Sequence, residues 1–144
     1  MTETRRAAPE APAEPVGYPM RIRWADVDQL GHVNNAIVLV YLDEGRDAFF
    51  KRHDVARQGY VVAHCEIDFR AEMTLADRDI WVACEIVRVG NSSLRTRELI
   101  TNSTGRVLVE AEVVSVLWDP ATRGKREVSE AERHRLEDEG GFSR

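Results

Sequence analysis

The chain has 144 residues, about the length of one domain, and 43% of them are hydrophobic, which is enough for one packed core. Its 20 Lys and Arg against 25 Asp and Glu give a net charge of −5, which argues against a broadly basic nucleic-acid-binding protein. The longest apolar stretch, residues 36–42, is far shorter than the roughly 20 residues of a membrane span. We therefore expect neither a nucleic-acid nor a membrane partner.

The N-terminal region and the cysteines indicate the compartment. The N-terminus has no apolar stretch of the kind found in secretory signal peptides. Cys65 and Cys84 lack the CxxC spacing and are too few for a disulfide framework, so we expect buried, inert thiols. These observations predict a cytoplasmic protein.

Two regions differ in composition. Residues 1–17 place three prolines among Ala and Glu and offer little apolar surface, which predicts a disordered N-terminal arm. Residues 18–144 are predicted to form a single domain, and no internal repeat is visible in them.

The domain is predicted to begin with a short strand. Met20, Ile22 and Trp24 alternate with more polar residues, and a period of two indicates one apolar strand face. The three tryptophans of the chain are expected to be anchors in the core or at an interface. A polar, glycine-containing turn follows at residues 26–32.

A long helix is predicted after this turn. Asn34 and Asn35 precede the run AIVLVYLDEGRDAFFKRH, and asparagine is a preferred N-cap. The run continues to Phe50 without alternation, which favours a helix of about four to five turns. Its first half is apolar all round, so we expect burial on every side.

The remaining sequence predicts a sheet and a last helix. Turn signals at 90–91 and 102–105 separate three strand-like segments, which predicts an antiparallel meander. A terminal helix is expected from Ser129, where Glu132 completes a capping box. A curved antiparallel sheet wrapped around one long central helix fits this order, in an α+β domain. The strand-like segments are 60–70, 79–89, 93–101 and 107–118.

The residues that could take part in a reaction lie at 26–35, where a strand is followed by the buried helix. Two carboxylates, a glycine, a histidine and two asparagines fall within this segment. The first amides of a helix are unpaired and carry partial positive charge, so they stabilise an anion or a carbonyl that becomes an oxyanion. A carboxylate just upstream can attack that carbonyl or activate water. The same residue types also form ordinary turns and helix caps.

The order of these residues favours the chemical interpretation. The run RIRWADVDQLGHVNNAIVLVYLDEGRDAFF resembles the active-site segment of hotdog-fold acyl-CoA thioesterases, specifically the 4-hydroxybenzoyl-CoA thioesterase family. The matching motifs are Asp26-Val27-Asp28, Gly31-His32-Val33-Asn34-Asn35 and Tyr41-Leu42-Asp43.

The resemblance implies a hotdog fold that hydrolyses the thioester of an acyl-CoA. It implies no cofactor, with coenzyme A present only as part of the substrate. Asp28 would be the catalytic carboxylate, as nucleophile or as general base on water. The backbone amide of Asn35 would polarise the carbonyl, with Gly31 and His32 in the loop between them. It also implies homodimers, which often pair into homotetramers with active sites at subunit interfaces.

Some positions depart from the family pattern. Glu72 and Ala76-Asp77 stand where many relatives carry Pro and then Gly-Asp. Relatives carry a basic cluster where this chain has residues 90–93. The family's contacts to the phosphates of coenzyme A can therefore be assigned here only to nearby residues. Solvated surface charge is the default interpretation of Arg88, Arg95 and Arg97. The sharper hypothesis is that these arginines and Ser93 bind the phosphates of coenzyme A.

A row of polar residues, His64, Glu66, Asp68 and Arg70, shares one face of the predicted strand at 60–70. We interpret it as a solvated or inter-subunit face. The sharper hypothesis is that His64 faces the active site of a neighbouring subunit. Metal binding needs three or four converging ligands, and we expect no metal.

The sequence leaves two alternative functions open. Hydrolysis of acyl groups from a carrier protein would use the same residues, and a non-catalytic acyl-binding module would not need Asp28. A path for the acyl chain is expected between residues 41–50 and 57–62, but the sequence does not identify the acyl group.

Overall fold

The structure is a computed structural model, and it describes residues 15–137. Most of the predicted arm, residues 1–14, lies outside the described residues, as do residues 138–144 at the other end. The first strand, β1, begins at Tyr18, where we expected the domain to begin.

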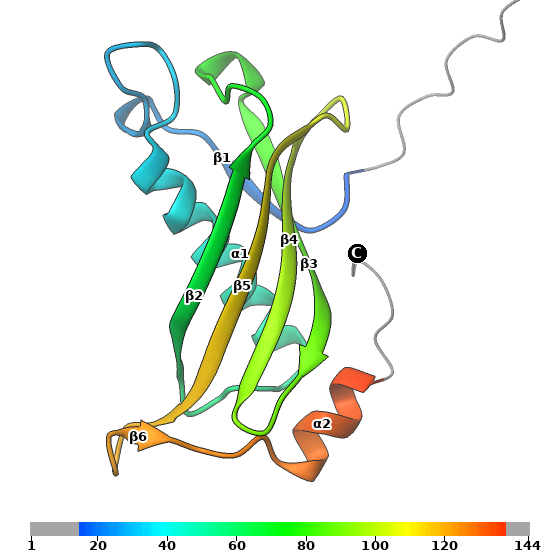
Figure 1. The fold of residues 1–144 in the computed structure, drawn as a ribbon. Helices are drawn as coiled ribbons and strands as arrows, with labels where there is room; N and C mark the ends of the chain where they lie inside the picture. The colour runs from blue at the N-terminus through cyan, green and yellow to red at the C-terminus, as the bar shows by residue number, and fades with distance from the viewer. Residues whose placement is uncertain (1–14, 138–144) are drawn as a thin grey trace, which may run out of the picture.

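One antiparallel sheet and one long helix make up the domain. The sheet has the strand order β1-β3-β4-β5-β2, so β1 and β2 lie at its two edges, and the short β6 pairs with β5. Figure 1 shows α1 crossing one face of the curled sheet. The hotdog architecture expected from the sequence is therefore confirmed. The strands are β1 (Tyr18–Arg21), β2 (Tyr60–Phe69), β3 (Asp79–Val89), β4 (Ser93–Asn102), β5 (Val107–Asp119) and β6 (Gly124–Lys125). The helices are η1 (Trp24–Asp26), α1 (Asn35–Arg52), η2 (Leu75–Asp77) and α2 (Glu130–Glu137).

The meander β3–β4–β5 follows the predicted turns. In β4 the buried and half-buried positions alternate strictly, as expected for a strand with one face on the core. Its inward positions carry Leu94 and Ile100, both fully buried, but also Thr96 and Glu98. The sheet therefore presents a mainly apolar face to α1 with a polar centre.

The capping predictions for both helices are confirmed. The Asn34 side chain accepts a hydrogen bond from the Ala36 amide at 2.8 Å, and α1 begins at Asn35. At α2, the Ser129 hydroxyl accepts from the Glu132 amide and the Glu132 carboxylate accepts from the Ser129 amide, both at 3.1 Å. Within the described part of the chain, no helix is both long and apolar enough to cross a membrane.

The predicted first strand is wrong in its second half. β1 ends at Arg21, and residues 24–26 form a single 3-10 turn. The Arg23 amide donates to the Asp26 carboxylate at 3.1 Å, and that contact bends the chain away from the sheet. Trp24 is 83% exposed, so it is not a core residue.

The burial predicted on every side of α1 is also wrong. Val38 and Leu42 face the sheet and are buried, whereas Leu39 and Val40 are each more than 40% exposed. The single sheet covers only one side of the helix (Figure 1). The first half of α1 therefore carries an apolar strip that the chain itself does not cover.

Candidate active site

The loop before α1 is held by backbone hydrogen bonds. The Asn34 amide donates to the Asp26 carbonyl at 2.9 Å, and Val27 forms an antiparallel bridge with Val33. The Val33 amide donates to the Met73 carbonyl at 2.7 Å, which joins this loop to the segment between β2 and β3. These contacts fix the residues just upstream of the helix.

Asp28 lies at the exposed tip of this loop. Its Oδ1 accepts hydrogen bonds from the Leu30 amide at 2.9 Å and the His32 amide at 3.2 Å. Gly31 completes the turn with a φ of 79°, a conformation that side chains disfavour. Oδ2 accepts no hydrogen bond from residues 15–137. The carboxylate is thus oriented through one oxygen and open to solvent through the other.

Asp26, two residues earlier, has the opposite environment. It is 1% exposed and accepts hydrogen bonds from the Tyr41 hydroxyl at 2.5 Å and the Arg23 guanidinium at 3.0 Å. Burial opposes its ionisation, but the hydrogen bonds from Arg23 and Tyr41 outweigh it and lower the pKa of Asp26. Asp26 is therefore a fully paired structural carboxylate that joins the loop to α1.

A cavity of about 230 Å³ opens beside the start of α1. His32 and Asn35 line it from the loop and the helix, and Glu72 lines it from the segment after β2. His32 Nε2 lies 2.7 Å from a carboxylate oxygen of Glu72. The sequence did not indicate a role for Glu72. The remaining lining residues are Val33, Val38, Phe69, Ala71, Met73 and Val109.

A buried ion pair occupies the centre of the interface between α1 and the sheet. Arg46 donates to Glu98 through Nε at 2.6 Å and through a terminal nitrogen at 3.1 Å, and both side chains are at most 2% exposed. The Thr96 hydroxyl donates to Glu98 at 2.8 Å, and Arg46 also donates to Asp43 at 2.7 Å. Burial raises the pKa of Glu98, while Arg46 and Thr96 oppose that shift. This cluster fixes the position of α1 on β4.

The structure places His64 away from the start of α1. It lies exposed on the edge strand β2, with Nε2 3.2 Å from Glu66 on the same strand. A β-bulge between Val62 and His64 shifts the register with β5. Within this chain His64 does not reach the cavity, and its predicted contact with a neighbouring subunit stays a prediction.

The predicted phosphate-binding arginines lie on the outer face of the sheet. Leu94, Thr96 and Glu98 point inward, so Arg95 and Arg97 between them point outward. Arg95 pairs with Glu112 across β5, and Arg97 pairs with Glu110 at 3.0 Å.

Arg88 is exposed near the same turn, and Ser93 begins β4. The structure therefore groups these four residues away from the cavity at α1. Their role towards coenzyme A remains a prediction.

The two cysteines differ in burial. Cys84 is 2% exposed, in agreement with the expected inert thiol, whereas Cys65 is half-buried. Burial raises the pKa of both thiols. Among residues 15–137, no group of three or more His, Cys, Asp or Glu side chains is arranged to hold a metal ion.

A protein-family model described as the thioesterase-like superfamily matches residues 22–136. The chain belongs to this superfamily. The match includes the loop before α1, the helix and the whole meander. Membership supports thioester hydrolysis as the class of reaction, but it does not single out the 4-hydroxybenzoyl-CoA family. No curated protein matches the chain.

Solved structures agree with this assignment. A thioesterase from Thermus thermophilus, in complex with coenzyme A and zinc, is 33% identical with a TM-score of 0.73, over 87% of this chain and 94% of its own. A protein from Bacillus stearothermophilus described as a predicted thioesterase is 27% identical with a TM-score of 0.75, over 85% and 94%. A 1,4-dihydroxy-2-naphthoyl-CoA thioesterase from Synechocystis, 18% identical with a TM-score of 0.73 over 85% and 96%, shares the fold.

Proposed function

We propose that this protein hydrolyses the thioester of an acyl-CoA to the free acid and coenzyme A. The observation that carries the proposal is Asp28, an exposed carboxylate oriented by two backbone amides in the loop that leads to the start of α1. Buried structural carboxylates have both oxygens paired, whereas Oδ2 of Asp28 remains open to a substrate or a water molecule.

The carboxylate supplies either a base or a nucleophile. As a base, Oδ2 of Asp28 takes a proton from water, whose oxygen attacks the thioester carbonyl carbon. As a nucleophile, Asp28 attacks that carbon itself and forms an anhydride, which water then hydrolyses. In both routes the carbon–sulfur bond breaks and the departing thiolate is protonated to give free coenzyme A.

The start of α1 supplies the electrophilic half of the reaction. The first-turn amides of a helix have no acceptor within the helix and carry partial positive charge. The Asn34 side chain occupies the amide of Ala36. Asn35 lines the cavity, and we assign its backbone amide to the thioester oxygen as that oxygen becomes an oxyanion.

His32 has a supporting role in this proposal. Its Nε2 faces Glu72, and a proton donated there leaves Nδ1 as an acceptor. That acceptor can orient a water molecule within the cavity. Glu72 acts through His32 and is a positioning residue.

Coenzyme A is preferred to a carrier protein as the leaving group because the Thermus thermophilus relative is in complex with coenzyme A. The test is thiol release from acetyl-, decanoyl-, palmitoyl- and aromatic-CoA thioesters, alongside the same acyl groups on acyl carrier protein. We expect turnover with at least one CoA thioester. Hydrolysis of only the carrier-protein thioesters would make acyl carrier protein the substrate. Binding of the thioesters without hydrolysis would indicate a non-catalytic acyl-binding module.

We also propose that the active protein is at least a homodimer, and more specifically a tetramer. β2 is an edge strand, and Val61, Val62 and Phe69 on it are each more than 40% exposed. On α1, Leu39 and Val40 are also more than 40% exposed. Exposed apolar edges favour pairing with another chain. Multi-angle light scattering at micromolar concentration should report two or four copies, and a monomer of the chain's 16.3 kDa would contradict the proposal.

A hollow of about 580 Å³ lies between α1 and β2, next to this edge. Its lining includes Asp43 and Asp47 from the helix and Tyr60 from the strand. Its lining residues belong to the two segments, 41–50 and 57–62, between which the sequence predicts the acyl chain. We keep that assignment as part of the proposal.

A further inference from the structure

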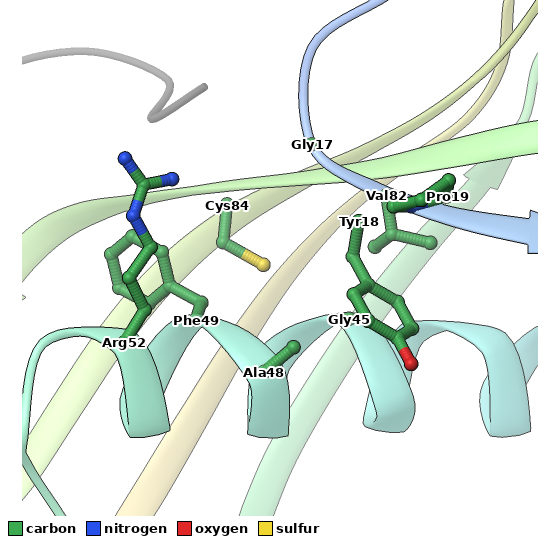
Figure 2. Close-up of a pocket in the computed structure, with 9 residues that line it drawn as sticks. All are labelled: Gly17, Tyr18, Pro19, Gly45, Ala48, Phe49, Arg52, Val82 and Cys84. Atoms are coloured by element: carbon green, nitrogen blue, oxygen red, sulfur yellow. The ribbon is translucent and has the colours of Figure 1, made fainter.

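A second cavity lies on the other side of α1, between the helix and the strands β1 and β3. Its volume is about 200 Å³. Figure 2 shows Tyr18 and Arg52 at its two ends, with the Cys84 sulfur between them. Phe49, Val82 and Cys84 are at most 7% exposed, whereas Tyr18 is 43% exposed, so the cavity has a buried floor and an open rim. Its lining residues are Gly17, Tyr18, Pro19, Gly45, Ala48, Phe49, Arg52, Val82 and Cys84.

Small residues on α1 shape this cavity. At Gly45 the helix approaches β3 so closely that a Cβ atom would lie 2.3 Å from the Val82 side chain. One turn further along, Ala48 faces the space in front of Cys84, and neither side chain is large enough to fill it (Figure 2). Protein interiors are close-packed, and unfilled spaces larger than a water molecule are few. The size and apolar character of this space therefore suit a small ligand.

The charge at the rim of the cavity indicates which polar group the ligand carries. Among the described residues that line the cavity, only Arg52 carries a charge. Arg52 is exposed and has no ion-pair partner among residues 15–137. Its neighbour Lys51, in contrast, is paired with Asp47 at 2.8 Å. A guanidinium group binds a carboxylate with paired hydrogen bonds.

We propose that this cavity is a second binding site, for a small apolar carboxylate. The ring or alkyl chain would lie over Ala48, Val82 and Cys84, and the carboxylate would bind the Arg52 guanidinium. An apolar cavity of roughly 150 Å³ is sufficient for benzene, so the space here accommodates one aromatic ring or a short alkyl chain. No residue lining it lines the cavity at the start of α1.

The proposal does not depend on the thioesterase mechanism, but the two are chemically related. Hydrolysis of an acyl-CoA releases a carboxylate, and a small apolar acid is the class of ligand that this cavity fits. The site would then bind the free acid away from the carboxylate and helix start that release it.

The test is calorimetric titration of the full-length protein with benzoate and with hexanoate, and with benzyl alcohol as an uncharged match. We expect Arg52→Gln to weaken carboxylate binding by about tenfold or more while leaving benzyl alcohol unaffected, since a charge-assisted hydrogen bond is lost. Lys51→Gln is the matched control, because it removes the same charge from the adjacent residue and should change binding little.

A second variant fills the cavity. Ala48→Leu keeps a good helix former at a half-buried position, so the fold should survive, as thermal unfolding will verify. We expect it to abolish binding of both carboxylates and of benzyl alcohol. Loss of binding in this variant with retention in Asp28→Asn would separate the cavity from the proposed active site.

The binding measurements on wild-type protein and the two variants decide the proposal. Failure of wild-type protein to bind either carboxylate at millimolar concentration would overturn the proposal. Binding unchanged by both Arg52→Gln and Ala48→Leu would overturn it too. Thioester hydrolysis, measured in parallel, should be unchanged in Arg52→Gln, so the two proposals fail independently.

Discussion

Asp26 and Asp28 are two residues apart in the same loop, yet their surroundings differ completely. Asp26 is 1% exposed and is held by Tyr41 and Arg23, whereas Asp28 lies at the exposed tip with one oxygen free of hydrogen bonds from residues 15–137. The 3-10 turn at residues 24–26 and the bridge between Val27 and Val33 separate the two environments.

The difference shows that two carboxylates in one polar turn can have different roles, one in stability and one in catalysis. A buried carboxylate with all its partners in place contributes to stability, and its removal leaves donors unsatisfied. An exposed carboxylate oriented by backbone amides contributes little to stability and is available for chemistry. Variants should therefore separate into those that change the free energy of unfolding and those that change turnover.

The largest effect on stability is expected at the buried carboxylate of Glu98. Glu98→Gln leaves the buried charge of Arg46 with only the exposed Asp43 as a counter-ion, and removal of one partner of a buried ion pair typically costs about 3–5 kcal/mol. Urea unfolding measures this change in free energy. The matched control is Glu112→Gln, which breaks the more exposed pair with Arg95 and should cost only about 0.2–1 kcal/mol. Equal costs for the two variants would contradict the assignment.

The next effect is expected on turnover at the start of α1. Asn35→Pro removes the amide donor at a position where proline is tolerated, and loss of an oxyanion donor typically lowers kcat by about 10²–10³. Asn35→Ala keeps the amide and should remain nearly as active as wild type. An equal loss of kcat in both variants, with both folded, would assign oxyanion stabilisation to the Asn35 side chain. Wild-type kcat in both would exclude the helix start as the oxyanion site.

The smallest effect is expected at the pair of His32 with Glu72. Glu72→Gln should lower kcat about two- to fivefold, because His32 loses the partner that orients it. Stability should fall by no more than about 1 kcal/mol, since the pair is exposed. Asp79→Asn breaks another exposed ion pair, with Arg21 on β1, outside the cavity at the start of α1, and should leave kcat unchanged.

Local signals in the sequence predicted much of the fold. Asn34 marked the start of α1, Ser129 with Glu132 marked α2, and the two turn signals marked the meander. Each signal depends on residues within a few positions, so one sequence is sufficient to detect it. The resemblance also selected the loop before α1 as the candidate site.

Long-range contacts could not be predicted from the same patterns. Asp26 rather than Asp28 is buried because the Tyr41 hydroxyl, on α1, donates a hydrogen bond to Asp26. Glu72 lies in the cavity because the backbone after β2 pairs with the loop before α1. Glu98 faces inward on β4, and only its pairing with Arg46, 52 residues away in the sequence, explains its burial.

The central claim is that Asp28 is catalytic and Asp26 is structural. The most direct measurement compares Asp26→Asn and Asp28→Asn by kcat on a confirmed thioester and by the free energy of unfolding in urea. We expect Asp28→Asn to lower kcat by about 10²–10⁴ with stability within about 0.5 kcal/mol of wild type. Asp26→Asn should lower stability by about 1.5–3 kcal/mol, because charged hydrogen bonds are lost, while the folded enzyme keeps most of its turnover. Wild-type turnover in Asp28→Asn would contradict the account.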